Sequence, residues 1–126
     1  MSFDFTLSIP LGTLLFLMLA HWVGDFVLQS DAIAKGKSKS LDVLFTHVLI
    51  YTGVMFWSAC IVMPIQTAGR WVVVNAVLHF VTDFLTSKAS ARLFAKGDVH
   101  NGFVVIGFDQ FLHLVCLTLT WALIAA

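Results

Sequence analysis

The stretch Phe103–Ala125, FVVIGFDQFLHLVCLTLTWALIA, is the longest run of mainly apolar residues in the chain. A helix needs about 20 such residues to cross the hydrocarbon layer of a membrane. We place four predicted spans at residues 9–28, 43–63, 71–87 and 103–125. The sequence therefore predicts an all-α fold: an integral membrane, antiparallel four-helix bundle that forms a single transmembrane domain over residues 1–126.

The composition also favours an apolar environment. Of all residues 60% are hydrophobic and 11% are charged, whereas a soluble domain carries about 25% charged residues. The seven basic and seven acidic residues cancel, so no basic surface is available for the phosphates of nucleic acid. We expect the lipid bilayer as a partner and no binding of nucleic acid.

The basic residues indicate how the spans are oriented. Short loops rich in Lys and Arg remain in the cytoplasm. Six of the seven basic residues follow the first or the third span: Lys35, Lys37, Lys39, Lys88, Arg92 and Lys96. Both termini are thus predicted on the non-cytoplasmic side. Trp71 and Trp121 would then lie at the outer interface, which amphipathic rings prefer.

The connectors between the spans differ in character. Residues 30–42 are polar, and we interpret Gly36-Lys37-Ser38-Lys39 as a solvated turn, because the upstream glycine and preceding strand of a phosphate loop are missing. Residues 64–70 are predicted to form a tight turn. After the third span, apolar residues recur every four positions from Leu85 to Leu93. This pattern predicts that the third helix continues along the inner surface, with Gly97 just past its end.

Ionisable residues inside the predicted spans carry the main functional signal, because such groups are costly in a membrane and usually face the bundle interior. Three spans each contain a His and an Asp four positions apart, hence on one helix face: His21 and Asp25, His79 and Asp83, Asp109 and His113. The order reverses in the fourth span, which runs in the opposite direction. Each Asp is therefore expected nearer the cytoplasm, with its His about 6 Å deeper.

His47, near the cytoplasmic start of the second span, joins this layer. Seven groups are thus expected to converge in the inner half of the membrane: His21, Asp25, His47, His79, Asp83, Asp109 and His113. A weak internal repeat supports two helical hairpins about a pseudo-twofold axis, since His21-Trp-Val-Gly-Asp25-Phe26 resembles His79-Phe-Val-Thr-Asp83-Phe84.

At these residues the chain resembles a known family. The matching pieces are His21-x-x-x-Asp25-Phe26-x-Leu28-Gln29, His47 with Tyr51, His79-x-x-x-Asp83-x-x-x-x-Lys88, and Asp109-Gln110-x-x-His113. They are similar to an uncharacterised bacterial and phage family of small multi-span membrane proteins, domain of unknown function 3307. The resemblance implies a multi-pass protein of the bacterial inner (cytoplasmic) membrane, and it supplies no reaction.

The residue types favour a metal site. Neutral imidazole and carboxylate suit Zn, Mn or Fe, and seven groups could hold one or two ions with a bridging Asp. We expect a divalent metal, Zn first, with Mn and Fe as alternatives. Iron for oxidation chemistry ranks lower, because diiron bundles use Glu and this chain contains none.

A metal near the inner leaflet would activate water, and we predict a metal-dependent hydrolase acting on an amphiphilic or phosphate-containing substrate. Asp25, Asp83 and Asp109 are its candidate catalytic residues. Lys88, Gln29 and Gln110 are candidates for binding a substrate head group. For Lys88 an interfacial lysine whose ammonium reaches toward water is an alternative.

Two other functions stay open at this point. Intramembrane Asp and His are common in proton and cation transporters or channels, and four helices would then require a homo-oligomer to form the conduit. Alternatively, the pairs serve a non-enzymatic scaffold, in which each interhelical hydrogen bond contributes about 0.6 kcal/mol to packing.

Overall fold

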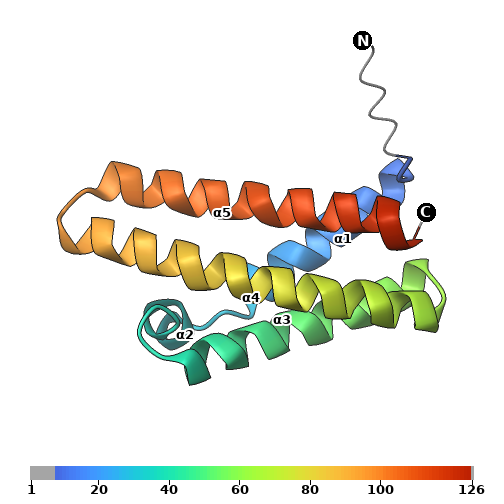
Figure 1. Ribbon diagram of the computed structural model, residues 1–126, viewed down its shortest axis with the longest axis horizontal. Helices are drawn as coiled ribbons and strands as arrows, with labels where there is room; N and C mark the ends of the chain where they lie inside the picture. The colour runs from blue at the N-terminus through green and yellow to red at the C-terminus, as the bar shows by residue number, and fades with distance from the viewer. Residues whose placement is uncertain (1–7, 126) are drawn as a thin grey trace, which may run out of the picture.

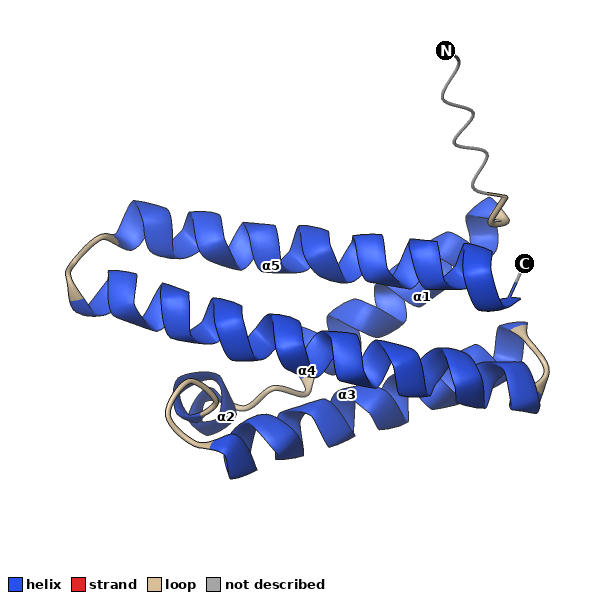
Figure 2. Cartoon of the chain, viewed as in Figure 1, coloured by secondary structure: helices blue, strands red, loops and turns tan. Residues whose placement is uncertain are grey.

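The computed structural model describes residues 8–125, which form helices and no strand (Figure 2). Helix α1 (Leu11–Trp22) continues into a π-helical turn, η1 (Val23–Val27). A short helix, α2 (Asp31–Gly36), precedes α3 (Leu41–Val62) and α4 (Ile65–Ala95). Helix α5 (Val99–Thr120) ends in a second π-helical turn, η2 (Trp121–Ala125). The all-α prediction is confirmed, while α2 was not predicted.

Helices α3, α4 and α5 lie side by side and alternate in direction (Figure 1). Helix α1 packs against α3, behind α4 and α5 in this view. Helix α2 packs on the start of α3, at the end of the molecule where α4 turns into α5. The lysine-rich connector that contains α2 is therefore folded against the bundle.

Two helical stretches are long and apolar enough to cross a membrane, Leu41–Val62 and Val99–Ala125. The stretch Leu11–Val27 is apolar but shorter. Helix α4 is long enough but does not meet this criterion, because it carries the polar side chains that face the bundle interior, among them Asn75, His79 and Asp83. The helices predicted as spans are all present, and length and apolarity support two of the four as spans.

Helix α4 exceeds its predicted limits at both ends. It runs on to Ala95 as the four-residue spacing indicated, and Gly97 follows with a positive φ of 78°. The Asp98 N–H donates to the Leu93 carbonyl, which closes the helix in a Schellman-type turn. The predicted tight turn at residues 64–70 is wrong, because α4 begins at Ile65 directly after Pro64.

The half of the bundle that contains the start of α1 and the end of α5 has an apolar core, which joins α1, α3, α4 and the end of α5. Trp71 is fully buried there and Trp121 is 8% exposed. The prediction that both indoles lie at an outer interface is wrong, because packing turns both rings inward. Asn75 is buried in this half too, where it donates to the Thr120 hydroxyl at 2.9 Å.

Candidate metal centre

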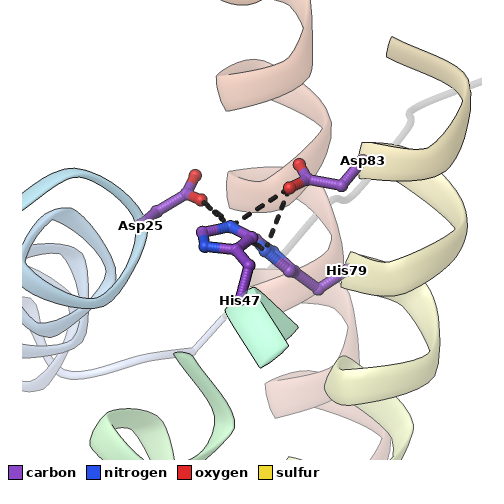
Figure 3. A group of neighbouring side chains, drawn as sticks. All are labelled: Asp25, His47, His79 and Asp83. Atoms are coloured by element: carbon purple, nitrogen blue, oxygen red, sulfur yellow. Dashed lines mark hydrogen bonds and ion pairs between the residues drawn. The ribbon is translucent and has the colours of Figure 1, made fainter. Parts of the chain in front are cut away.

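Four buried side chains from three elements meet at one point, and we call Asp25, His47, His79 and Asp83 the four-residue cluster (Figure 3). His47 lies between the two carboxylates, with its Nε2 at 3.0 Å from Asp25 Oδ1 and 3.1 Å from Asp83 Oδ2. The Nε2 of His79 is 3.6 Å from each of the same two oxygens. The two imidazole Nε2 atoms are 3.3 Å apart.

These distances have the size expected around a tetrahedral ion. Ligand atoms about 2.0–2.2 Å from a metal at tetrahedral angles lie about 3.3–3.6 Å from one another. Five of the six separations run from 3.0 to 3.6 Å, and all six are within 4.8 Å. Two nitrogen and two oxygen ligands of this kind suit zinc. The four-residue cluster could therefore hold a metal ion with little rearrangement.

A second group shares Asp25 and adds two residues of α5, and we call Asp25, Asp109 and His113 the three-residue cluster. Their ligand atoms all lie within 4.8 Å of one another. His113 Nε2 is 3.1 Å from Asp109 Oδ2 and 3.2 Å from Asp83 Oδ1. The two clusters are thus adjacent and are joined through both Asp25 and His113.

A local irregularity brings Asp25 to its place. Asp25 lies in the π-helical turn η1, where the Leu28 N–H donates to the Val23 carbonyl five residues earlier. Such turns are rare in proteins overall, and those that occur are often found at functional sites. The neighbouring Gly24 packs tightly on α3, since a Cβ there would lie 3.1 Å from the ring of Tyr51. This close approach sets Asp25 beside His47.

His21 belongs to neither cluster, although it was predicted as a ligand. Its Nε2 lies 2.7 Å from Gln110 Oε1 and its Nδ1 lies 2.8 Å from the Tyr51 hydroxyl. The Gln110 amide nitrogen donates to Asp25 and Asp109, so its oxygen must face His21. His21 therefore donates from Nε2, and its Nδ1 accepts the hydrogen bond from Tyr51.

Gln110 and His21 thus orient the carboxylates. Gln110 was predicted to bind a substrate head group, and the structure places its amide nitrogen 3.1 Å from Asp25 Oδ2 and 2.9 Å from Asp109 Oδ2. Partners of this kind, which hold a ligand without binding the metal, tune metal sites strongly. His79 is held differently, by stacking between the rings of Tyr51 and His113.

Lys37 is the site residue that the sequence analysis missed. Its Nζ lies 3.0 Å from Asp83 Oδ2, and its side chain is only 14% exposed. The predicted solvated turn is therefore wrong at this position. No periodicity marks Lys37, because it follows α2 in an irregular connector. The fold of that connector alone brings the ammonium group to the cluster.

With its histidines neutral, the site carries an unbalanced charge within the protein. In their ionised forms the buried Asp25, Asp83 and Asp109 bring three negative charges, and Lys37 brings one positive charge. Buried charges require compensation by partners or by a metal. One divalent cation would neutralise the two remaining charges, which agrees with the donor set of the four-residue cluster.

A cavity of about 560 Å³ adjoins the site. Its walls come from η1, from α2 with the connector that follows it, and from facing parts of α4 and α5. Asp25, Asp109 and Gln110 line it, whereas His47, His79 and Asp83 do not. The three-residue cluster therefore faces open space, and the four-residue cluster is enclosed.

The remaining two predicted head-group residues lie apart. Gln29 lines the cavity. Lys88 is not among the lining residues, and its ammonium donates to the Ser38 carbonyl at 3.0 Å and lies over the ring of Phe84. Lys88 thus fastens the α2 connector to α4.

Fold and site together define a class: an all-helical bundle whose interior holds His and Asp clusters able to bind metal. The family model described as "Protein of unknown function (DUF3307)" matches residues 13–126, and the chain belongs to this family. The predicted resemblance to domain of unknown function 3307 is thereby confirmed. No curated protein and no solved structure matches the chain.

Proposed function

We propose that this protein is a membrane-embedded metalloenzyme, a hydrolase with Zn as the first candidate ion. The observation that carries the proposal is the four-residue cluster, in which five of the six ligand-atom pairs lie 3.0 to 3.6 Å apart. A metal ion accounts for two imidazole nitrogens 3.3 Å apart between the same two carboxylates.

Membrane insertion is supported by the outer surface of the bundle. The two longest apolar stretches, α3 and α5 with η2, are mostly exposed: 33% of the apolar segment of α3 and 22% of that of α5 with η2 is buried. Large apolar side chains point outward, among them Trp57 at 72% and Leu123 at 85% exposure. Soluble monomers rarely expose such extended apolar surface. We place the protein in the bacterial inner membrane, with the α2 connector on the cytoplasmic side.

Hydrolysis is supported by the three-residue cluster. Catalytic metal sites keep three protein ligands and leave a position for water. Asp25, Asp109 and His113 would supply these ligands, and two of them line the cavity. A metal there would lower the pKa of bound water to about 7 and present it to a phosphoryl or acyl group in the cavity. The substrate would be amphiphilic, entering from the inner leaflet.

Transport is the second candidate and has less support. The cavity opens beside the lysine-rich connector, while the opposite half of the bundle is filled by apolar side chains such as Leu17, Met55 and Trp71. A conduit would have to pass through this core. A homo-oligomer with a shared path between subunits is the arrangement that transport would require.

The test is a metal analysis of protein purified in a neutral detergent, without chelators and without a polyhistidine tag. We expect about one to two ions of Zn, Mn or Fe per chain. Release of inorganic phosphate from a long-chain alkyl phosphate should then stop on chelation and resume when that ion is restored.

Protein that folds but contains no metal would overturn the proposal. A proton or cation flux in liposomes that is lost in Asp83→Asn would favour transport instead.

A further inference from the structure

Lys37 touches two different environments. Its ammonium pairs with Asp83 of the enclosed four-residue cluster, and the same side chain lines the cavity. Lys35 and Lys39 also line the cavity, but both are exposed, and the Lys35 ammonium binds Asp31 at 2.8 Å. Lys37 differs from them because it is half-buried and pairs with a carboxylate of the four-residue cluster, so it is placed to exchange that partner for an anion bound in the cavity.

Besides Lys37, the cavity contains a polar group that has no hydrogen-bond partner in the described part of the chain. Ser87 lines the cavity and is 9% exposed, yet its buried hydroxyl has no hydrogen-bond partner within residues 8–125. Gln29 also lines the cavity, and its side-chain oxygen likewise has no hydrogen-bond partner among the described residues. Buried polar atoms are normally satisfied, so each exception calls for an explanation such as a missing ligand.

Much of the remaining cavity wall is apolar, although Thr86 and Ser90 of α4 also line it. Ala91, Phe94 and Ala95 of α4 line it, with Phe26 and Ile106 from the flanking elements. A cavity of about 560 Å³ has the size of a small-molecule site. One end is therefore suited to an anion and the rest to a hydrocarbon chain.

We propose that this cavity binds a phosphate-bearing amphiphile, whose phosphate group is held by Lys37 and Ser87 beside the three-residue cluster and whose chain lies along α4. Phosphate fits better than carboxylate, because it offers enough oxygen atoms for the ammonium, the hydroxyl and a metal together. This inference rests on the proposed function for the reaction that follows binding. Loss of Lys37 from Asp83 when a metal binds would free the ammonium for the phosphate.

The test uses protein of measured and equal metal content, because the Asp25 and Asp109 carboxylates that line the same cavity repel an anion unless a cation offsets them. Three soluble probes are compared: hexyl phosphate, inorganic phosphate and hexanol. Calorimetry should give hexyl phosphate an affinity at least about tenfold above that of inorganic phosphate, because only the former fills the apolar wall. Hexanol should not bind. Equal affinities for the two phosphates would mean that the cavity binds free phosphate. This result would overturn the proposal that the ligand is an amphiphile.

Matched variants isolate the two head-group contacts. Lys37→Gln should weaken hexyl phosphate binding by about tenfold or more, while Lys37→Arg keeps it and Lys96→Gln, outside the cavity, leaves it unchanged. Ser87→Ala should weaken it by about threefold to tenfold. Ser90→Ala is its control, because Ser90 is equally buried and lines the cavity but already donates to the Ser87 carbonyl.

Asp83→Asn should change the affinity for hexyl phosphate in the opposite direction. It releases Lys37 from its ion pair and should strengthen hexyl phosphate binding by about threefold or more when compared with wild type at equal metal content. Absence of binding in both wild type and Asp83→Asn would overturn this inference and leave the proposed function standing if metal is present. Binding that depends on Lys37, in protein that never acquires metal, would uphold the cavity site and refute the hydrolase.

Discussion

The two clusters share Asp25 but differ in enclosure. The four-residue cluster is surrounded by η1, α3 and α4, and three of its members have no contact with the cavity. The three-residue cluster has one protein ligand fewer, and both of its carboxylates line the cavity. Closed metal sites with four protein ligands serve structure, whereas open sites with three ligands serve catalysis. Under the proposed function, the four-residue cluster would hold a structural ion, and the three-residue cluster would hold the ion that takes part in hydrolysis.

Replacing Asp25, the residue common to both clusters, should have the largest effect. Asp25→Asn keeps the side-chain shape but removes the negative charge that both positions use. We expect bound metal to fall below about a tenth of the wild-type content, measured by elemental analysis. Asp31→Asn is the control, because Asp31 is exposed on α2, where its carboxylate pairs with Lys35. Metal content unchanged in Asp25→Asn would refute the shared ligand.

A matched pair of histidine substitutions separates the clusters. His79 and His113 are each 2% exposed and stack on one another, so their truncation removes similar packing. His79→Ala should weaken the tightly bound ion by about 100-fold or more, because it removes one ligand from the enclosed site. His113→Ala should keep about one ion per chain yet lose hydrolysis. Equal loss of metal in both variants would mean that the two clusters form one site.

Tyr51→Phe should give the smallest effect. It removes the hydroxyl that donates to His21 and keeps the ring that stacks on His79 at 3.9 Å. Only the chain of hydrogen bonds from Tyr51 through His21 and Gln110 to the two carboxylates is disturbed. We expect metal affinity to fall by about tenfold, measured by competition with a chromogenic chelator. A loss as large as that of His79→Ala would place His21 among the ligands.

Much of the helical framework and part of the site could be predicted from the sequence. The apolar runs mark the four long helices, because backbone groups in an apolar environment must bond within their own segment. The spacing of four residues fixes which His and Asp share a helix face, and the alternation of direction brings six of the seven predicted groups into the two adjacent clusters. Even the extension of α4 to Ala95 follows from local periodicity.

The differences at Trp71, Trp121 and His21 have a common cause. Spacing along a helix fixes relative positions on its surface but not the rotation of that helix against its neighbours. The rotation turned Trp71 and Trp121 into the core. The rotation also separates the two histidines of the repeated His-x-x-x-Asp motif. His79 is a member of the four-residue cluster, whereas His21 is hydrogen-bonded to Gln110 and Tyr51.

By itself, then, the sequence determined the helices and the faces that carry ionisable groups, because both depend on interactions within a turn or two of the chain. The tertiary structure alone decided which histidines face one another, where the cavity lies and how Lys37 reaches Asp83 across an irregular connector. These depend on contacts between residues far apart in the chain, such as Gly24 against Tyr51, and no local pattern records them.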